Sequence, residues 1–139
     1  MGRPEWRGAA MPFVNIKVAG PALAPERVRC LQRGATRLMA EVMRKRPELT
    51  AVLVERVDAA GWSVGGEPVR VAAHLDVKVT AGTNTGAEKA RFVADAMRLL
   101  RDVLGGDLDP VAYVVVHEVP GDAWGWDGRT QAGRAAAAR

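Results

Sequence analysis

Pro12 is the residue whose chemistry depends most on its place in the chain, because it directly follows a methionine, Met11. Inside a chain, a proline nitrogen is a tertiary amide without useful basicity. At a free N-terminus it is a secondary amine, and an α-amino group has a pKa of roughly 7.7–8.0. Burial in an apolar pocket would lower that pKa by penalising the ammonium form. Such an amine could remove a proton α to a carbonyl, or form an iminium with an aldehyde or ketone.

This chemistry requires that the chain begin at Pro12, whereas residues 1–10 precede Met11 in the sequence. These residues are rich in Gly, Arg and Ala and have no hydrophobic periodicity, so we expect a leader outside the fold. We further expect translation to begin at Met11 and the methionine to be removed, because proline is a small second residue. If the leader is retained, Pro12 is an amide. The alternative role for Pro12 is structural, as the first residue of an edge strand, where a missing N–H costs nothing.

The sequence repeats itself. Residues 16–20 recur as residues 77–82, and the segment 52–57 recurs as 114–119, each time followed by a tryptophan and glycines. Lys17 and Lys78 are 61 positions apart, and Trp62 and Trp124 are 62 apart. A nearly constant offset of this kind indicates a tandem duplication of one structural unit.

Each unit is predicted to run strand, helix, strand. Alternating apolar residues indicate strands, and apolar residues at steps of three and four indicate helices, the first beginning at Pro25 and the second capped by Thr85 with Glu88. The predicted strands are residues 12–18, 52–57, 69–79 and 113–119, and the predicted helices end near residues 44–46 and 105–106. A helix between two strands of one sheet implies a parallel crossover.

These elements predict an α+β fold built from α/β-type units. Two tandem β-α-β units, residues 11–67 and 68–128, would form a four-stranded mixed sheet with two helices on one face. Residues 129–139 are predicted to be a flexible basic tail.

Composition excludes several classes of protein. The 139 residues are 48% hydrophobic and 26% charged, as in a soluble domain, and no apolar segment approaches the roughly 20 residues needed to cross a membrane. Without an apolar signal-peptide core, we expect a cytoplasmic protein. Cys30 is the sole cysteine, so no disulfide framework is possible. The net charge of +4 arises at the two ends of the chain, which argues against nucleic-acid binding. His74 and His117 are expected to be structural, with no metal site.

The segment from Met11 to Val18 resembles the start of the 4-oxalocrotonate tautomerases, in which proline follows the initiator methionine. The repeated tryptophan-glycine segments resemble the hairpin that closes each such unit. The chain is therefore similar to a fused, tandem member of the tautomerase superfamily, whose fold also includes migration inhibitory factor. The resemblance implies an isomerase without a cofactor, in which Pro12 is the general base for keto-enol tautomerisation of a small 2-oxo acid or related carbonyl compound. Decarboxylation or hydration of a small oxo acid by the same proline remains an alternative. A non-catalytic oligomeric binding protein is another, if the leader is retained.

The sequence departs from the family pattern at the residues that would bind the substrate. Family arginines that hold substrate carboxylates are replaced here by residues that carry no positive charge: Pro21, Ala51, Thr83 and Tyr113. Arg70 and Lys78 share one strand face with His74 and are candidate substitutes, although solvated or interface charges would look the same. We take Trp124, Arg70, Lys78 and Tyr113 as candidate substrate-binding residues. Trp124 matches the family's pocket wall, although packing on the core explains it equally well.

A second pocket, walled by Trp62, would be centred on Ala73, which cannot act as a base. One functional site per chain is expected.

The predicted sheet has polar side chains on the face that the helices leave uncovered, including Arg70, His74, Asp76 and Lys78. Closed rotational symmetry is the common way to cover such a face. In the family, six single units form a ring, so three fused chains would supply the same six units. We therefore expect a homotrimer of about 40 kDa, whose exposed strand edges pair between chains.

Overall fold

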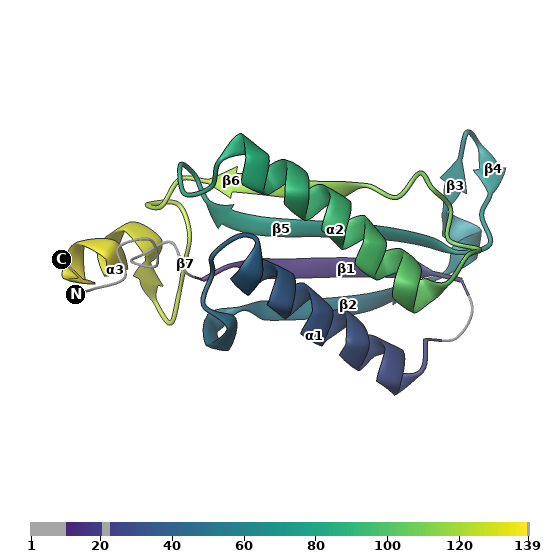
Figure 1. The fold of residues 1–139 in the computed structure, drawn as a ribbon, viewed down its shortest axis with the longest axis horizontal. Coiled ribbons are helices and arrows are strands. Elements are labelled where there is room, and N and C mark those ends of the chain that lie inside the picture. The colour runs from purple at the N-terminus through teal and green to yellow at the C-terminus, as the bar shows by residue number, and fades with distance from the viewer. Residues whose placement is uncertain (1–10, 21–22, 139) are drawn as a thin grey trace.

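A computed structural model of the chain describes residues 11–20 and 23–138; the expected leader, residues 1–10, lies outside them. Two long helices cover one face of a four-stranded sheet, and a hairpin lies at each end of the molecule (Figure 1). The sheet strands are β1 (Phe13–Ala19), β2 (Ala51–Val57), β5 (Ala72–Thr80) and β6 (Val114–Val119). The helices are α1 (Pro25–Glu41), α2 (Gly86–Leu104) and α3 (Gln131–Ala138), with 3-10 turns at Pro47–Leu49 and Ala59–Gly61. The short hairpin strands are β3 (Ser63–Val64), β4 (Glu67–Pro68), β7 (Gly125–Trp126) and β8 (Arg129–Thr130).

The strand order β2-β1-β5-β6 confirms the predicted mixed sheet. Strand β1 is parallel to β2, and β5 is parallel to β6, as two β-α-β crossovers require. The two units meet where β1 runs antiparallel to β5, with Phe13 opposite Lys78 and Lys17 opposite His74. The duplicated sequence therefore folds into two similar halves joined at the centre of the sheet.

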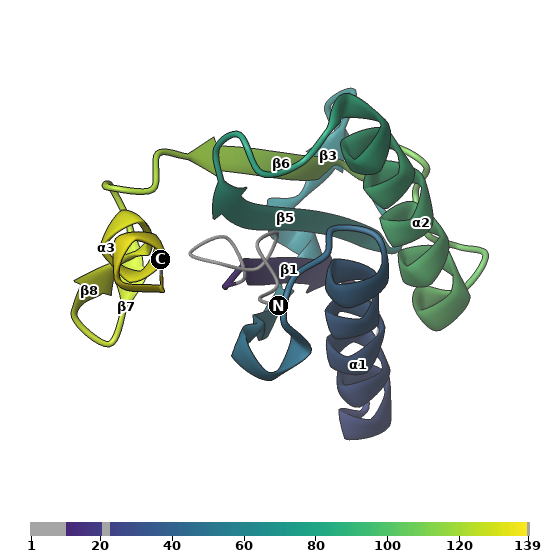
Figure 2. The same ribbon diagram turned by 60° about the vertical axis from the view of Figure 1, so that its left-hand side comes forward.

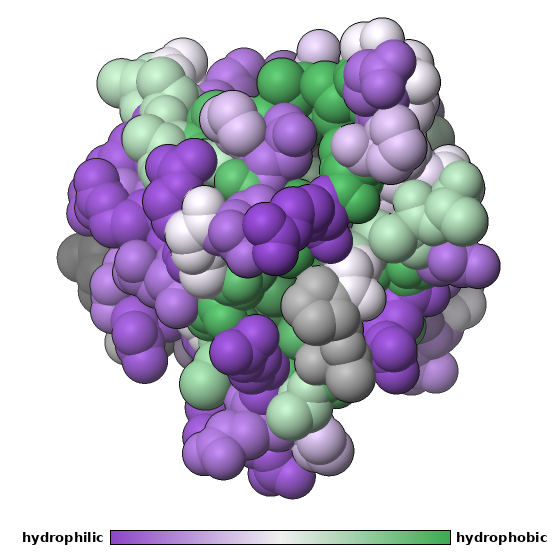
Figure 3. Space-filling view, turned by 90° about the vertical axis from the view of Figure 1, so that its right-hand side faces the viewer, coloured by the Kyte–Doolittle hydropathy of each residue, from purple (hydrophilic) through white to green (hydrophobic). Residues whose placement is uncertain are grey.

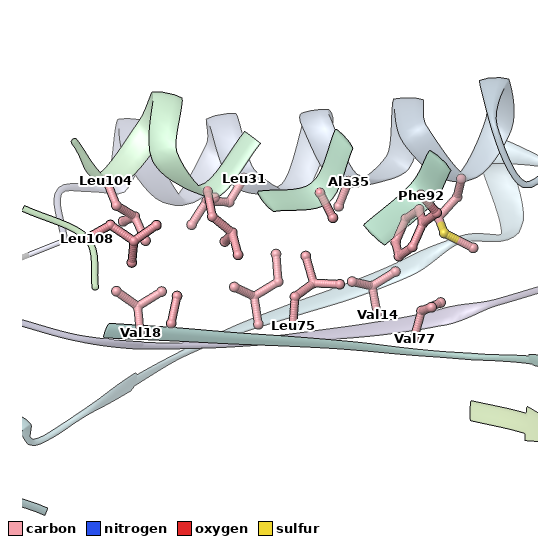
Figure 4. Packing of buried hydrophobic residues seen from close by; sticks show 14 of the residues in the cluster. Val14, Val18, Leu31, Ala35, Leu75, Val77, Phe92, Leu104 and Leu108 are labelled. Atoms are coloured by element: carbon pink, nitrogen blue, oxygen red, sulfur yellow. The ribbon is translucent and has the colours of Figure 1, made fainter. Parts of the chain in front are cut away.

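The hydrophobic core fills the space between the helices and the sheet (Figure 4). Alternation along β1 and β5 sends every second side chain toward the helices, as the period of two predicts. These side chains meet the apolar stripes of both helices, and the fully buried residues include Ile16, Leu31, Leu75, Phe92 and Leu100. Because burial of one such side chain contributes about 1.5–3 kcal/mol, this single layer holds the fold together. Figure 2 shows both helices on the same side of the strands.

The helix ends test the predicted boundaries. Helix α2 has the predicted capping box: Thr85 Oγ1 accepts from the backbone N–H of Glu88, and the Glu88 carboxylate accepts from that of Thr85. Helix α1 has Pro25 in its first turn but ends at Glu41, before the predicted stop near residues 44–46. There Arg44 adopts a left-handed conformation (φ 58°), which turns the chain and directs Lys45 inward.

The third predicted strand, residues 69–79, also differs from the structure at its start. Strand β5 begins at Ala72 rather than at residue 69, and Val71 forms only an isolated bridge to Leu108. Gly20 packs closely on the segment before β5, since a Cβ built at Gly20 would lie 2.8 Å from the carbonyl oxygen of Arg70.

The predicted flexible tail at residues 129–139 corresponds in the structure to β8 and α3, through Ala138. Strand β8 pairs with β7 across the turn Asp127–Gly128, both of which have the positive φ that two-residue hairpins favour. The alanine-rich segment that follows has high helix propensity and packs back on this hairpin. Residues 129–139 are basic and have little hydrophobic periodicity, so the sequence alone does not predict this packing.

No helix among the described residues combines the length and the apolar character needed to cross a membrane.

Lys45 is a buried lysine that hydrogen-bonds a hydroxyl group. It is 2% exposed, and its Nζ donates to Oγ1 of Thr83 at 2.9 Å. Burial lowers its pKa from 10.5 to about 8, and the Arg44 charge adds to this effect, against the opposing influence of Glu88. Arg44 in turn holds the Glu88 carboxylate through Nε at 2.7 Å, which lowers the pKa of Glu88 to about 2.

Because the pKa of Lys45 is lowered to about 8, we expect the protein to gain stability as pH rises from about 8 toward 10.5. In that window the folded state loses the proton and the unfolded state keeps it, so the free energy of unfolding increases with pH. Between roughly pH 7.5 and pH 9.5, the free energy of unfolding in urea should increase by about 2 kcal/mol more in the unmodified protein than in Lys45→Met, because the variant lacks the titrating group. If the free energy of unfolding depends on pH equally in the two proteins, the lowered pKa of Lys45 would be contradicted.

Candidate active site

Pro12 is buried at the start of β1 and lines a cavity of about 320 Å³. The cavity is lined chiefly by apolar side chains, among them Phe13, Leu49, Ala51, Trp124 and Trp126. Among the described residues, Lys78 and Gln131 contribute polar side chains to the cavity, in addition to the indole N–H groups. A volume of this size suits a small organic molecule.

Lys78 reaches this cavity because β5 runs antiparallel to β1. The register places Lys78 opposite Phe13, and its Nζ lies 5.8 Å from the centre of the Phe13 ring. The same nitrogen is 3.7 Å from Oδ1 of Asp76, a buried carboxylate on the open face of the sheet. Lys78 thus supplies a partly exposed positive charge at the mouth of an apolar pocket.

The β7–β8 hairpin forms the tryptophan wall. The indole nitrogen of Trp124 donates to Oγ1 of Thr80 at 3.3 Å, which ties the hairpin to the end of β5. Gly125 is required by close backbone approach, since a Cβ there would lie 1.9 Å from the carbonyl oxygen of Arg129. The guanidinium of Arg134, from α3, stacks on the Trp126 ring at 3.7 Å and donates to the Trp126 carbonyl. Helix α3 therefore braces the wall of the Pro12 cavity.

Gln131 is a cavity residue that the sequence analysis did not identify. It is 1% exposed, and its Nε2 donates to the carbonyl oxygen of Met11 at 3.1 Å. Its Oε1 is buried without a hydrogen-bond partner among the described residues. A single glutamine at the start of an alanine-rich segment carries no sequence signal for such a role, because the hairpin that positions it is a tertiary feature.

The structure brings together only some of the predicted site residues. Lys78 and Trp124 line the Pro12 cavity, whereas Arg70 and Tyr113 do not. The side chain of Arg70 is 84% exposed and lies 3.6 Å from Asp107. Arg70 lies before the first residue of β5 and Lys78 lies near the other end of that strand, so the face that alternation predicts for both does not bring their side chains together. Tyr113 lines a different cavity, with Trp62, Ala73 and His74.

Comparison with known proteins identifies the family. A profile of the family described as "Tautomerase enzyme" matches residues 12–72, beginning at Pro12. The curated protein "Probable tautomerase K2" of Dickeya dadantii (strain 3937) is 36% identical over 59 residues, which are 42% of this chain and 88% of that protein. The chain belongs to the tautomerase family of isomerases.

Solved structures extend this likeness to both halves of the tautomerase. A fused 4-OT wild-type symmetric trimer superposes with a TM-score of 0.78 at 19% identity, covering 87% of this chain and 97% of the other. The macrophage migration inhibitory factor-like protein of Entamoeba histolytica has a TM-score of 0.73 at 22% identity, with coverage of 86% and 98%. At these identities the likeness concerns the fold. The fused tautomerase fold that the resemblance implies is confirmed.

Proposed function

We propose that this tautomerase interconverts the keto and enol forms of a small 2-oxo acid or related carbonyl compound, with Pro12 as the general base after removal of Met11. The observation that carries the proposal is the burial of Pro12 in an apolar, tryptophan-walled cavity that also contains one lysine. The family profile begins at the same residue.

The surroundings of Pro12 favour a neutral amine near physiological pH. The apolar walls disfavour the ammonium form, and the positive charge of Lys78 at the cavity mouth acts in the same direction. A base whose pKa lies near the working pH combines the correct protonation state with an effective driving force for proton transfer. Both effects therefore support catalysis by the amine.

The proposed reaction needs only proton transfers. In ketonisation, the Pro12 nitrogen accepts the enol hydroxyl proton. As the O–H electron pair becomes the second bond of the carbonyl, the C=C electron pair shifts to the neighbouring carbon, which takes the proton back from the ammonium. The enolisation direction reverses these steps, and atoms and charge balance without another reactant. Lys78 would hold the substrate carboxylate during both transfers.

Gln131 would support this arrangement once Met11 is absent. Its amide now hydrogen-bonds the Met11 carbonyl, and removal of that residue would leave a buried amide facing the amine. A buried amide without partners is unfavourable by about 1–3 kcal/mol, so a hydrogen bond to the pyrrolidine nitrogen or to the substrate carbonyl would be favoured. We propose that Gln131 orients one of these groups.

The start of the chain provides the decisive test. Protein produced from Met11, with an intact mass confirming that it begins at Pro12, should ketonise phenylenolpyruvate. Protein that retains residues 1–10 should have a kcat/KM lower by about 10³-fold or more, because its proline nitrogen is an amide. Pro12→Ala in the shorter chain is the control for a different N-terminal amine. Equal activity of the long and short chains would refute the proline mechanism and favour a binding or different catalytic role.

Lys78 is expected to act on substrate binding. Lys78→Ala should lower kcat/KM for a carboxylate substrate by about tenfold, mainly through KM, since one charged contact contributes about 1.5–3 kcal/mol at most. The pKa in the kcat/KM profile that reports the amine should rise, because a neighbouring positive charge has been removed. Lys17→Ala is the matched control, since Lys17 is the repeat counterpart and does not line the cavity. An unchanged KM and pH profile for Lys78→Ala would exclude this role.

We also propose that the protein is a homotrimer. The open face of its sheet carries charged groups, and the exposed apolar side chain of Leu53 lies on edge strand β2. Three copies of a two-unit chain would bury these features by closed symmetry, and one structurally similar fused 4-OT is described as a symmetric trimer.

Light scattering at micromolar concentration should give about 40 kDa, three times the mass of a chain that begins at Pro12. Leu53→Glu should shift the mass toward the single chain, whereas Val93→Glu, an equally apolar and exposed position on the helix layer, should not. A stable monomer in the unmodified protein would overturn the proposed assembly.

A further inference from the structure

A second cavity, of about 370 Å³, lies at the opposite end of the sheet from Pro12. The residues that shape it include Trp62, Ser63, Ala73, His74, Val111 and Tyr113. We name it the Ala73 pocket. It lies beside the β3–β4 hairpin, at the end of the molecule drawn in Figure 3, where apolar surface is interspersed with polar side chains.

The internal repeat relates the Ala73 pocket to the Pro12 cavity. An offset of 61 or 62 positions converts Pro12 to Ala73, Leu49 to Val111 and Trp124 to Trp62, and each pair lines the two cavities in equivalent places. The two volumes are also similar, at about 370 and 320 Å³. The duplication has therefore preserved a cavity as well as a fold.

The Ala73 pocket has lost its base. The Ala73 nitrogen is a backbone amide within β5, and it cannot accept a proton at physiological pH. The pocket nevertheless keeps its tryptophan and its open volume. Tyr113 remains 65% exposed and Val111 45% exposed, so neither side chain has collapsed to fill the space. This combination suits binding without turnover.

The lining defines the chemistry of the ligand. Trp62, Ser63, His74 and Tyr113 can each donate a hydrogen bond, and no carboxylate lines the pocket among the described residues. His74 directs Nε2 toward Oδ2 of Asp76 at 3.4 Å, which leaves Nδ1 for a ligand. Lys17 lies opposite His74 in the strand register, but it does not line the pocket and its ammonium pairs with Glu55 at 3.8 Å. Several hydrogen-bond donors beside an indole favour a small planar molecule that carries a carboxylate.

We propose that the Ala73 pocket is a second, non-catalytic binding site for a small planar carboxylate. It would bind the same chemical class as the Pro12 cavity, but without proton transfer. The site does not depend on a free amine at Pro12, so its existence can be tested whether or not the proline mechanism is correct.

The test uses 4-hydroxybenzoate, a planar carboxylate that cannot undergo ketonisation, and calorimetric titration of the full oligomer. We expect two molecules bound per chain. Val111→Trp should fill the Ala73 pocket and remove one of them, while ketonisation of phenylenolpyruvate stays within about twofold of the unmodified protein. Leu49→Trp is the matched variant and should remove the other molecule together with activity.

A milder variant guards against misfolding. Tyr113→Phe retains the ring and should weaken one of the two sites by about three- to tenfold, as expected for one lost hydrogen bond. Binding of one molecule per chain that is lost in Leu49→Trp and unaffected by Val111→Trp and Tyr113→Phe would overturn the proposal. So would the absence of any binding at up to about 10 mM ligand.

Discussion

The antiparallel pairing of β1 with β5 is the contact on which the rest of the molecule depends. It joins the two duplicated units into one sheet and fixes which residue of one unit faces which residue of the other. Because the strands run in opposite directions, the start of β1 meets the end of β5, and Lys78 comes to lie beside Phe13. A shift of one residue would send the apolar side chains of either strand to the open face, so the hydrophobic core enforces this register. The position of Lys78 at the Pro12 cavity is thus set by core packing.

The same pairing accounts for the polar groups at the centre of the open face. Asn15 and Asp76 face each other in the register, and both are mostly buried although no helix covers them. Asn15 donates to Glu55, whereas Asp76 lies within 4 Å of three side chains that can carry positive charge: those of His74, Lys78 and His117. Asp76 therefore lies between a residue of the Ala73 pocket and a residue of the Pro12 cavity. Its Oδ1 has no hydrogen bond from the described residues, so the Lys78 ammonium at 3.7 Å provides its electrostatic compensation.

Patterns with a fixed period predicted most of the fold. Strand alternation, helical spacing and the capping box at Thr85 act locally, and the near-constant offset of the repeat constrained how the units combine. The site was harder to predict for two physical reasons. Alternation specifies a face but not where a strand begins, so the sequence pattern groups Arg70 with Lys78, although Arg70 lies before the start of β5 and Lys78 lies near its end. Gln131 and the α3 brace depend on contacts with a hairpin, and their sequence contains alanine, glycine and arginine in no apolar pattern.

Gene duplication places a strict limit on a site built around an N-terminal amine. A fused chain has one N-terminus, so only one of its two equivalent cavities can contain a proline with a secondary amine. A proline at residue 73 would restore the side chain but would still be an amide, and would remove a backbone N–H from a central strand. Selection for the base is therefore absent in the second cavity, whereas selection for the fold continues to require its strands and hairpin. Ala73 is compatible with the fold, and the surrounding residues are free to acquire a different role. His74 and Tyr113 are hydrogen-bond donors, whereas the equivalent residues of the first cavity are Phe13 and Ala51. The two cavities differ most in chemistry at these positions.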